Sequence, residues 1–188
     1  ANIMNELLHT RKIMRFLLWG MLLFSGYTVF FTKDATAELA NTNIVIKANI
    51  VANTCRVSPD SLNKFVDLGV WGTKDFQQKN TTEPVKFTLN LTDCSIVTSG
   101  VKVMFSGDTD SKDSTLFKLA EKNAAQNIGI AILDKNQNKI LPGKSSMIYP
   151  VETTNNISLD FYAQYIATNK DVVGGSANGE VLFSLEYL

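Results

Sequence analysis

The sequence predicts an all-β sandwich, and three of its features carry this prediction. Apolar and polar residues alternate with a period of two over most of residues 38–188, as expected of strands that bury one face. The alternating runs are short and end at polar or glycine-containing turns, which gives about seven to nine strands. β-Branched and aromatic residues, which fit pleated and half-buried surfaces, are frequent in these runs.

The first expected strand covers residues 43–52, NIVIKANIVA. One face of this strand carries Ile44, Ile46, Ala48, Ile50 and Ala52. The last expected strand covers residues 179–188, GEVLFSLEYL. Its apolar face carries Val181, Phe183, Leu185 and Tyr187. An alternating strand at the end of a sheet needs a neighbour or a protected edge, so the question is which segment lies beside this one.

The strands between these two follow the same pattern. They are expected at residues 65–71, 85–91, 101–105, 128–132 and 157–165. The alternation changes parity between Leu91 and Cys94, which predicts a bulge or turn at Thr92–Asp93. Residues 116–126 are the one segment that could form a helical turn.

The N-terminal segment has the three parts of a secretory signal peptide. Basic residues precede an apolar run at residues 16–31, and the small residues Ala35-Thr36-Ala37 follow it. Residues 1–37 are therefore expected to be cleaved after Ala37. A retained membrane anchor is the alternative, but the run is shorter than the roughly 20 apolar residues that span a bilayer.

The two cysteines, Cys55 and Cys94, both lie in the part expected to be exported. An even number of cysteines behind a signal peptide indicates a disulfide bond. Two free buried thiols are the alternative.

Few groups after residue 37 could support catalysis or metal binding. The single histidine, His9, lies in the expected signal peptide, which excludes Ser-His-Asp and Cys-His arrangements from the exported chain. Asp108, Asp110 and Asp113 have the spacing of a calcium loop but lack its central glycine and final glutamate, so a polar loop is expected. The formal net charge is 0, with no concentrated basic run for nucleic acid. We expect no catalytic residue, metal site, cofactor, small-molecule substrate or nucleic-acid partner.

The C-terminal pattern resembles that of the pilin subunits of chaperone–usher fimbriae of the type 1 family. Gly175 is the fourteenth residue from the end, Tyr187 is penultimate, and apolar residues alternate between them. Four other stretches are similar to that family: residues 66–69 (VDLG), 73–76 (TKDF), 87–94 (FTLNLTDC) and 160–169 (DFYAQYIATN). The chain is slightly more similar to minor, adaptor-like subunits.

This resemblance implies an incomplete immunoglobulin-like β-sandwich that lacks its final strand and is completed by a donor strand from another subunit. Residues 38–53 would be the donor-strand extension, with Ile44, Ile46, Ala48, Ile50 and Ala52 as donor residues, and residues 54–188 the pilin domain. The acceptor edge, held first by a chaperone, would include Gly175, Val181, Phe183, Leu185 and Tyr187. Family donor strands often have glycine where this chain has Ala48, whose methyl group must then fit the groove.

The function implied is that of a structural fimbrial subunit, which polymerises by donor-strand exchange into a surface fibre that supports cell adhesion. Its implied partners are a periplasmic fimbrial chaperone, an outer-membrane usher and neighbouring pilin subunits, and it would reach the cell surface through the periplasm. The alternative is a self-complete secreted β-sandwich that binds carbohydrate or protein, in which residues 43–52 pair within their own chain. An exported hydrolase is a third hypothesis, which requires carboxylates that converge in a cleft.

Overall fold

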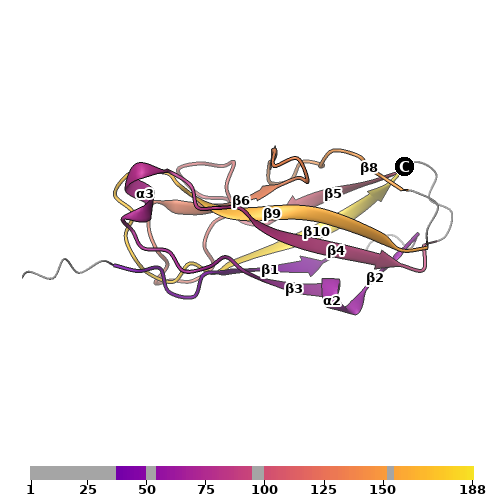
Figure 1. The fold of residues 1–188 in the computed structure, drawn as a ribbon, viewed down its shortest axis with the longest axis horizontal. Helices are drawn as coiled ribbons and strands as arrows, with labels where there is room; N and C mark the ends of the chain where they lie inside the picture. The colour runs from indigo at the N-terminus through magenta and orange to yellow at the C-terminus, as the bar shows by residue number, and fades with distance from the viewer. Residues whose placement is uncertain (1–36, 50–53, 95–99, 152–154) are drawn as a thin grey trace, which may run out of the picture. The chain divides into compact units, whose positions relative to one another are not determined.

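The computed structural model of the chain describes residues 37–49, 54–94, 100–151 and 155–188. The expected signal peptide, apart from Ala37, and the expected donor residues Ile50 and Ala52 lie outside these residues. In chain order the elements are β1 (Asn43–Ala48), β2 (Arg56–Val57), α2 (Pro59–Leu62), β3 (Asn63–Asp67), α3 (Asp75–Gln78), β4 (Val85–Thr92), β5 (Gly100–Ser106), β6 (Ile128–Leu133), β7 (Lys139–Ile140), β8 (Tyr149–Pro150), β9 (Ile157–Ala167) and β10 (Gly179–Tyr187) (Figure 1).

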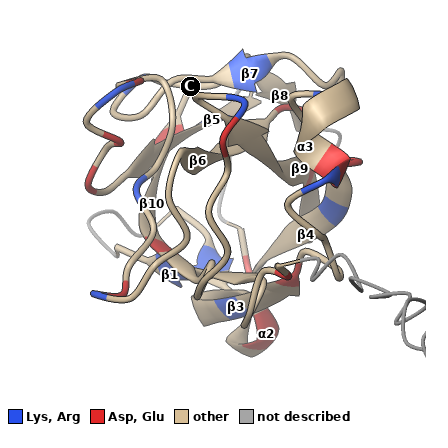
Figure 2. Ribbon diagram, turned by 90° about the vertical axis from the view of Figure 1, so that its left-hand side faces the viewer, with Lys and Arg blue, Asp and Glu red and all other residues tan. Residues whose placement is uncertain are grey.

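The strands form two five-stranded sheets that pack face to face. One sheet has the order β3-β1-β10-β5-β8 and the other the order β2-β4-β9-β6-β7. The inward residues of both sheets form one core, at whose centre the rings of Phe87, Phe105 and Phe161 lie 5.1 to 6.4 Å apart. Viewed end-on, the strands surround this core, and lysine, arginine, aspartate and glutamate positions are spread around the ribbon (Figure 2). The predicted all-β sandwich is confirmed.

Sequence alternation located the long strands well. The strands expected at residues 85–91, 101–105, 128–132 and 157–165 correspond to β4, β5, β6 and β9. The turn expected at Thr92–Asp93 is also present, because β4 ends at Thr92 and Asp93 has a φ of 50°. The disulfide bond between Cys55 and Cys94 forms as predicted.

The helical turn considered for residues 116–126 does not form. Phe117 instead exchanges two backbone hydrogen bonds with Ile130 of β6, at 2.8 and 3.0 Å. Leu116 packs on the outer face of the same strand beside Ala131 and Leu133, which explains why every residue of β6 is buried. Gly129 leaves the room for Leu116, since a Cβ atom there would lie 2.8 Å from the Leu116 Cβ. Pairing with a buried strand therefore overrides the weak helical tendency of this segment.

Candidate functional site

The candidate site is the groove between β3 and β10, which the N-terminal strand β1 fills. β10 is paired with β5 on one side and with β1 on the other, and β1 is paired in turn with β3 (Figure 1). Without β1, the facing edges of β3 and β10 would lack a partner and the core between them would be open. The sandwich is thus incomplete without this strand, and here the strand comes from the same chain.

β1 runs parallel to β10, whereas the other ladders between the described strands are antiparallel. Ile44 lies opposite Gly179, Ile46 opposite Val181, and Ala48 opposite Phe183. Backbone pairing extends beyond β1 at both ends. The flanking hydrogen bonds are Leu39 N to Trp71 O (2.9 Å), Ala40 N to Gly175 O (2.8 Å), Ala177 N to Ala40 O (2.8 Å) and Asn49 N to Phe183 O (2.8 Å).

The side chains of β1 that face the core complete it. Ile44 and Ile46 are both 0% exposed, and Ala48 is partly buried against the core. These three of the expected donor residues therefore do face the groove. Their surroundings in a neighbouring subunit remain a prediction.

Sequence alternation missed one groove residue, Leu39, which is 4% exposed. Counted from Ile44 with a period of two, Leu39 falls on the outward face. However, Asn41 has a φ of 51°, in the left-handed region that asparagine tolerates better than most residues, and this changes the parity of the chain. The one available signal was an isolated leucine, separated by Ala40 from the three polar residues at positions 41–43.

The residues expected along the acceptor edge lie along one wall of the groove. Val181 and Phe183 are buried beside β1, while Leu185 and Tyr187 are partly buried and pair with Val103 and Val101 of β5. Gly175 lies at the other end, where its carbonyl accepts the hydrogen bond from Ala40. A Cβ atom on Gly175 would lie 2.8 Å from both the Ala125 nitrogen and the Asn123 oxygen, so only glycine lets these segments approach so closely.

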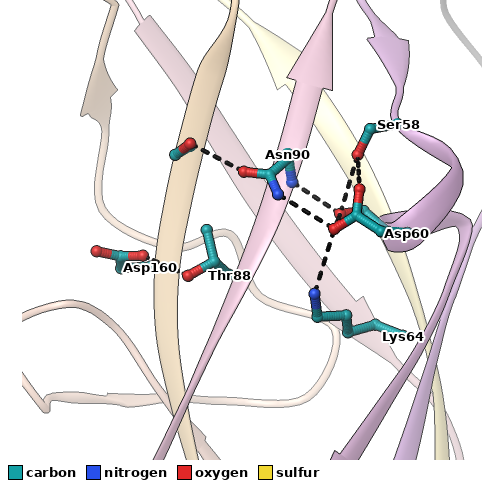
Figure 3. A network of polar contacts seen from close by, with 8 residues as sticks. Ser58, Asp60, Lys64, Thr88, Asn90 and Asp160 are labelled. Carbon is teal, nitrogen blue, oxygen red and sulfur yellow. Dashed lines mark hydrogen bonds and ion pairs between the residues drawn. The ribbon is translucent and has the colours of Figure 1, made fainter.

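The opposite wall, β3, is held in place by a polar network at α2, the short helix that leads into it (Figure 3). The Asn90 backbone N–H on β4 donates to the Ser61 hydroxyl at 2.8 Å, and the Asn90 side-chain amide donates to Asp60 at 3.1 Å. Lys64 on β3 also donates to Asp60, at 3.3 Å. The network therefore joins the wall of the groove to the second sheet.

Asp60 is the charged centre of this network. The hydrogen bond from the Ser58 hydroxyl, together with those from Asn90 and Lys64, lowers the pKa of Asp60 from its ordinary value of 3.8 to about 2. A lowered folded-state pKa means that ionised Asp60 stabilises the fold above about pH 4, and that this contribution is lost as the pH falls toward 2.

Asp60→Asn should therefore flatten the acid sensitivity of the subunit, because it removes the titrating group but keeps an oxygen that can accept hydrogen bonds. We expect the wild-type subunit to lose more of its free energy of unfolding than the variant between about pH 4 and pH 2. Urea unfolding at several pH values measures this difference. Parallel pH curves for the two proteins would show that the network does not depend on the Asp60 charge.

Two carboxylates of the loop at residues 107–115 serve the local structure of that loop. Asp110 accepts hydrogen bonds from the backbone of Lys112 (2.8 Å) and Asp113 (3.1 Å), and Asp113 accepts two from Thr115, so these carboxylates shape their own loop. Among the described residues there is no group of three or more histidine, cysteine, aspartate or glutamate side chains placed to hold a metal ion. No helix among them is long and apolar enough to cross a membrane.

Comparison with solved structures identifies the fold. A structure of a chaperone–usher pilus matches with a TM-score of 0.59 and 15% identity, over 74% of this chain and 91% of that one. The P pilus rod subunit PapA matches with a TM-score of 0.56 and 14% identity, over 72% of this chain and 99% of PapA. These proteins have the same sandwich fold.

Comparison of sequences identifies the family. The model of the fimbrial protein family matches residues 44–188. The fimbrial-like protein FimF of Salmonella typhimurium is 33% identical over 173 residues, covering 92% of this chain and 96% of FimF. The S-fimbrial protein subunit SfaG of Escherichia coli is 31% identical over 149 residues, covering 79% and 84%. The chain thus belongs to the fimbrial protein family, and it is a structural subunit of a surface fimbrium.

Proposed function

We propose that the subunit polymerises by strand addition, in which β1 leaves its own groove and fills the groove between β3 and β10 of a neighbouring subunit. The observation that carries this proposal is the dependence of one sheet on β1. This strand is the first element of the described chain, and it lies between β3 and β10, which are paired with it and not with each other. Strand addition uses backbone hydrogen bonds for affinity and alternate side chains for specificity. β1 has both, since its ladder is continuous and Ile44 and Ile46 are fully buried.

Pairing of β1 within its own chain is what the alternative of a self-complete binding module predicts. Two observations favour strand exchange nevertheless. The β1–β10 ladder is parallel within a sheet that is otherwise antiparallel, and parallel pairing is slightly less stable per residue. The family and the fold are also those of fimbrial subunits.

The direction in which β1 enters a neighbouring groove determines the kind of assembly that strand exchange would produce. In its own groove the end of β1 that continues toward Cys55 lies beside Phe183, toward the Tyr187 end of β10. A strand exchanged in this direction would bring two subunits together by the same end and close them into a pair. A strand that enters the neighbour in the reverse direction would place its own subunit at the Gly175 end, so that subunits follow one another head to tail. An open fibre requires such a heterologous contact, and we propose the reverse direction for the fibre.

The same groove is proposed as the site held by a periplasmic fimbrial chaperone before an outer-membrane usher adds the subunit to the fibre. This step is supported by the position of β1 between β3 and β10, because its departure would expose both strand edges and the core side chains beneath it. An unprotected strand edge is a site of aggregation, so an exported subunit with an open groove needs a temporary partner. The role proposed for the chain is structural and does not include catalysis, and passage through the periplasm is part of the same proposal.

The test of this function is rescue by a strand supplied in trans. A subunit with Ile44→Asp and Ile46→Asp cannot fill its own groove, because two buried carboxylates would be desolvated. We expect it to fold poorly alone and to recover its melting temperature as a one-to-one complex when refolded with a synthetic peptide of residues 38–53. The matched control is the same peptide carrying both aspartates.

A photo-crosslinker at the N-terminus of the peptide reports direction in the same experiment. Reverse insertion should place the label near Tyr187, whereas insertion in the direction of β1 would place it near Gly175. Absence of rescue, or labelling at the Gly175 end alone, would contradict head-to-tail assembly by this strand.

A further inference from the structure

We propose that β1 in its own groove is a self-capped state of the subunit, which blocks strand exchange until β1 leaves, and that the pairs Ala48–Phe183 and Ile44–Gly179 specify this state. The inference rests on the strand-addition function proposed above. In this state β1 of the same chain competes with an incoming strand for the groove, and the side chains of the two pairs determine how strongly it competes.

At two of the three inward pairs in the parallel register of β1 and β10, a large side chain lies beside a small one. The large Ile44 lies opposite Gly179, which has no side chain, and the small Ala48 lies opposite the large, buried Phe183. At Gly179 a Cβ atom would lie 2.4 Å from Ile130 Cδ1 and 3.6 Å from Ile44 Cγ1, so the space beside this glycine is already filled. The strand and the wall of the groove therefore interdigitate in this register, as side chains do in a well-packed core.

The match gives a structural reason for alanine at position 48. Phe183 lies opposite and is buried, so a longer side chain at this partly buried position would compete with the phenylalanine ring for space. A strand that enters in the reverse direction meets the wall residues in another order, so its fit does not depend on the pair Ala48–Phe183. A substitution at Ala48 can for this reason weaken self-capping while the groove remains able to accept an incoming strand.

A charge pair on the outer face supports the same state. Lys47 Nζ lies 2.9 Å from Glu180 Oε1, which joins β1 to β10 on the solvent side of the sheet. Both side chains are exposed, so the pair contributes little to stability. It does report the register, because Glu180 lies opposite Val45 and Lys47 opposite Leu182, so the ion pair joins two diagonal neighbours of the parallel alignment.

The extent of pairing makes the self-capped state a barrier to exchange. Backbone hydrogen bonds hold the extension from Leu39 to Asn49 on both sides, and three apolar side chains are buried beneath it. An incoming strand finds these positions occupied. Its entry is then limited by the departure of β1, and the rate becomes independent of the concentration of the incoming strand.

The experiment measures uptake of a fluorescent peptide of residues 38–53 by the purified subunit. With the wild-type subunit we expect slow uptake at a rate that stays constant as the peptide concentration is raised. Ala48→Leu places a larger side chain beside Phe183 and should loosen β1. We therefore expect this variant to take up the peptide about tenfold faster than the wild-type subunit. Asn49→Leu is the matched control, because it adds a leucine to the next, exposed position, and it should leave the rate within about twofold of wild type.

A charge reversal gives a second, milder test that does not depend on repacking. Lys47→Glu places two carboxylates side by side and should speed uptake by a few-fold, and Lys47→Glu combined with Glu180→Lys should restore the wild-type rate. Fast uptake by the wild-type subunit, in proportion to peptide concentration and unchanged by Ala48→Leu or Lys47→Glu, would overturn self-capping. Failure of strand addition itself would appear elsewhere, as absence of rescue in the Ile44→Asp and Ile46→Asp subunit.

Discussion

Ile46→Ala is expected to lower the free energy of unfolding of the isolated subunit by about 2–5 kcal/mol. Ile46 is fully buried at the middle of β1, opposite Val181 on one side and Lys64 of β3 on the other. Its truncation removes apolar contacts and leaves a cavity where the two sheets meet, and no other described segment is placed to fill that space. Equilibrium unfolding in guanidinium chloride measures the loss.

The loss of unfolding free energy in Ile46→Ala depends on whether β1 can detach by itself. If the weakened strand detaches while the rest of the sandwich stays folded, the unfolding curve should show two steps, of which the first is the release of β1. Val45→Ala is the control, since Val45 is on the same strand but faces outward beside Phe65. A change for Ile46→Ala no larger than that for Val45→Ala would mean that β1 contributes no more than an outer strand, and the groove would lose its significance.

The long strands could be predicted from sequence because each buries one face, so apolar and polar residues alternate along it with a period of two. β9 is the clearest case, since Ile157, Leu159, Phe161, Ala163 and Tyr165 are all buried. The short strands β2, β7 and β8 have two residues each, too few to show any period, and their places depend on neighbours distant in sequence. β6 was found by its alternating isoleucines, but burial of its second face by Leu116 could not be inferred from the strand itself.

The candidate site was predictable in part for the same reason. The inward residues of β1 and β10 follow from alternation, and the importance of Gly175 follows from the family resemblance. The direction of β1 does not follow from either, because the alternating residue pattern of a strand is the same whether its neighbour is parallel or antiparallel. The network around Asp60 was equally hidden, since it joins α2 to Asn90, 30 residues further along the chain.

Removal of the disulfide bond, by Cys55→Ala with Cys94→Ala, is expected to lower the free energy of unfolding by about 4 kcal/mol. The two cysteines are 39 residues apart, and closing a loop of this length restricts the unfolded chain by about that amount on the chain-entropy model. The bond also secures the segment that follows β1. There β2 supplies only two residues of pairing, Arg56 with Thr92 and Val57 with Leu91, so little else among the described contacts fixes the chain at this point.

The measurement compares urea unfolding of the double variant with that of the wild-type subunit before and after reduction. If the bond acts mainly by restricting the unfolded chain, the reduced wild type and the double variant should lose similar stability, while peptide uptake by the folded subunits stays unchanged. If the bond also holds β1 in its groove, through the short connection from Asn49 to Cys55, uptake of the residue 38–53 peptide should become faster in the variant. A loss well below 2 kcal/mol with unchanged uptake would mean that the ladder of β2 with β4 already secures this segment, and the disulfide would then matter for neither stability nor exchange.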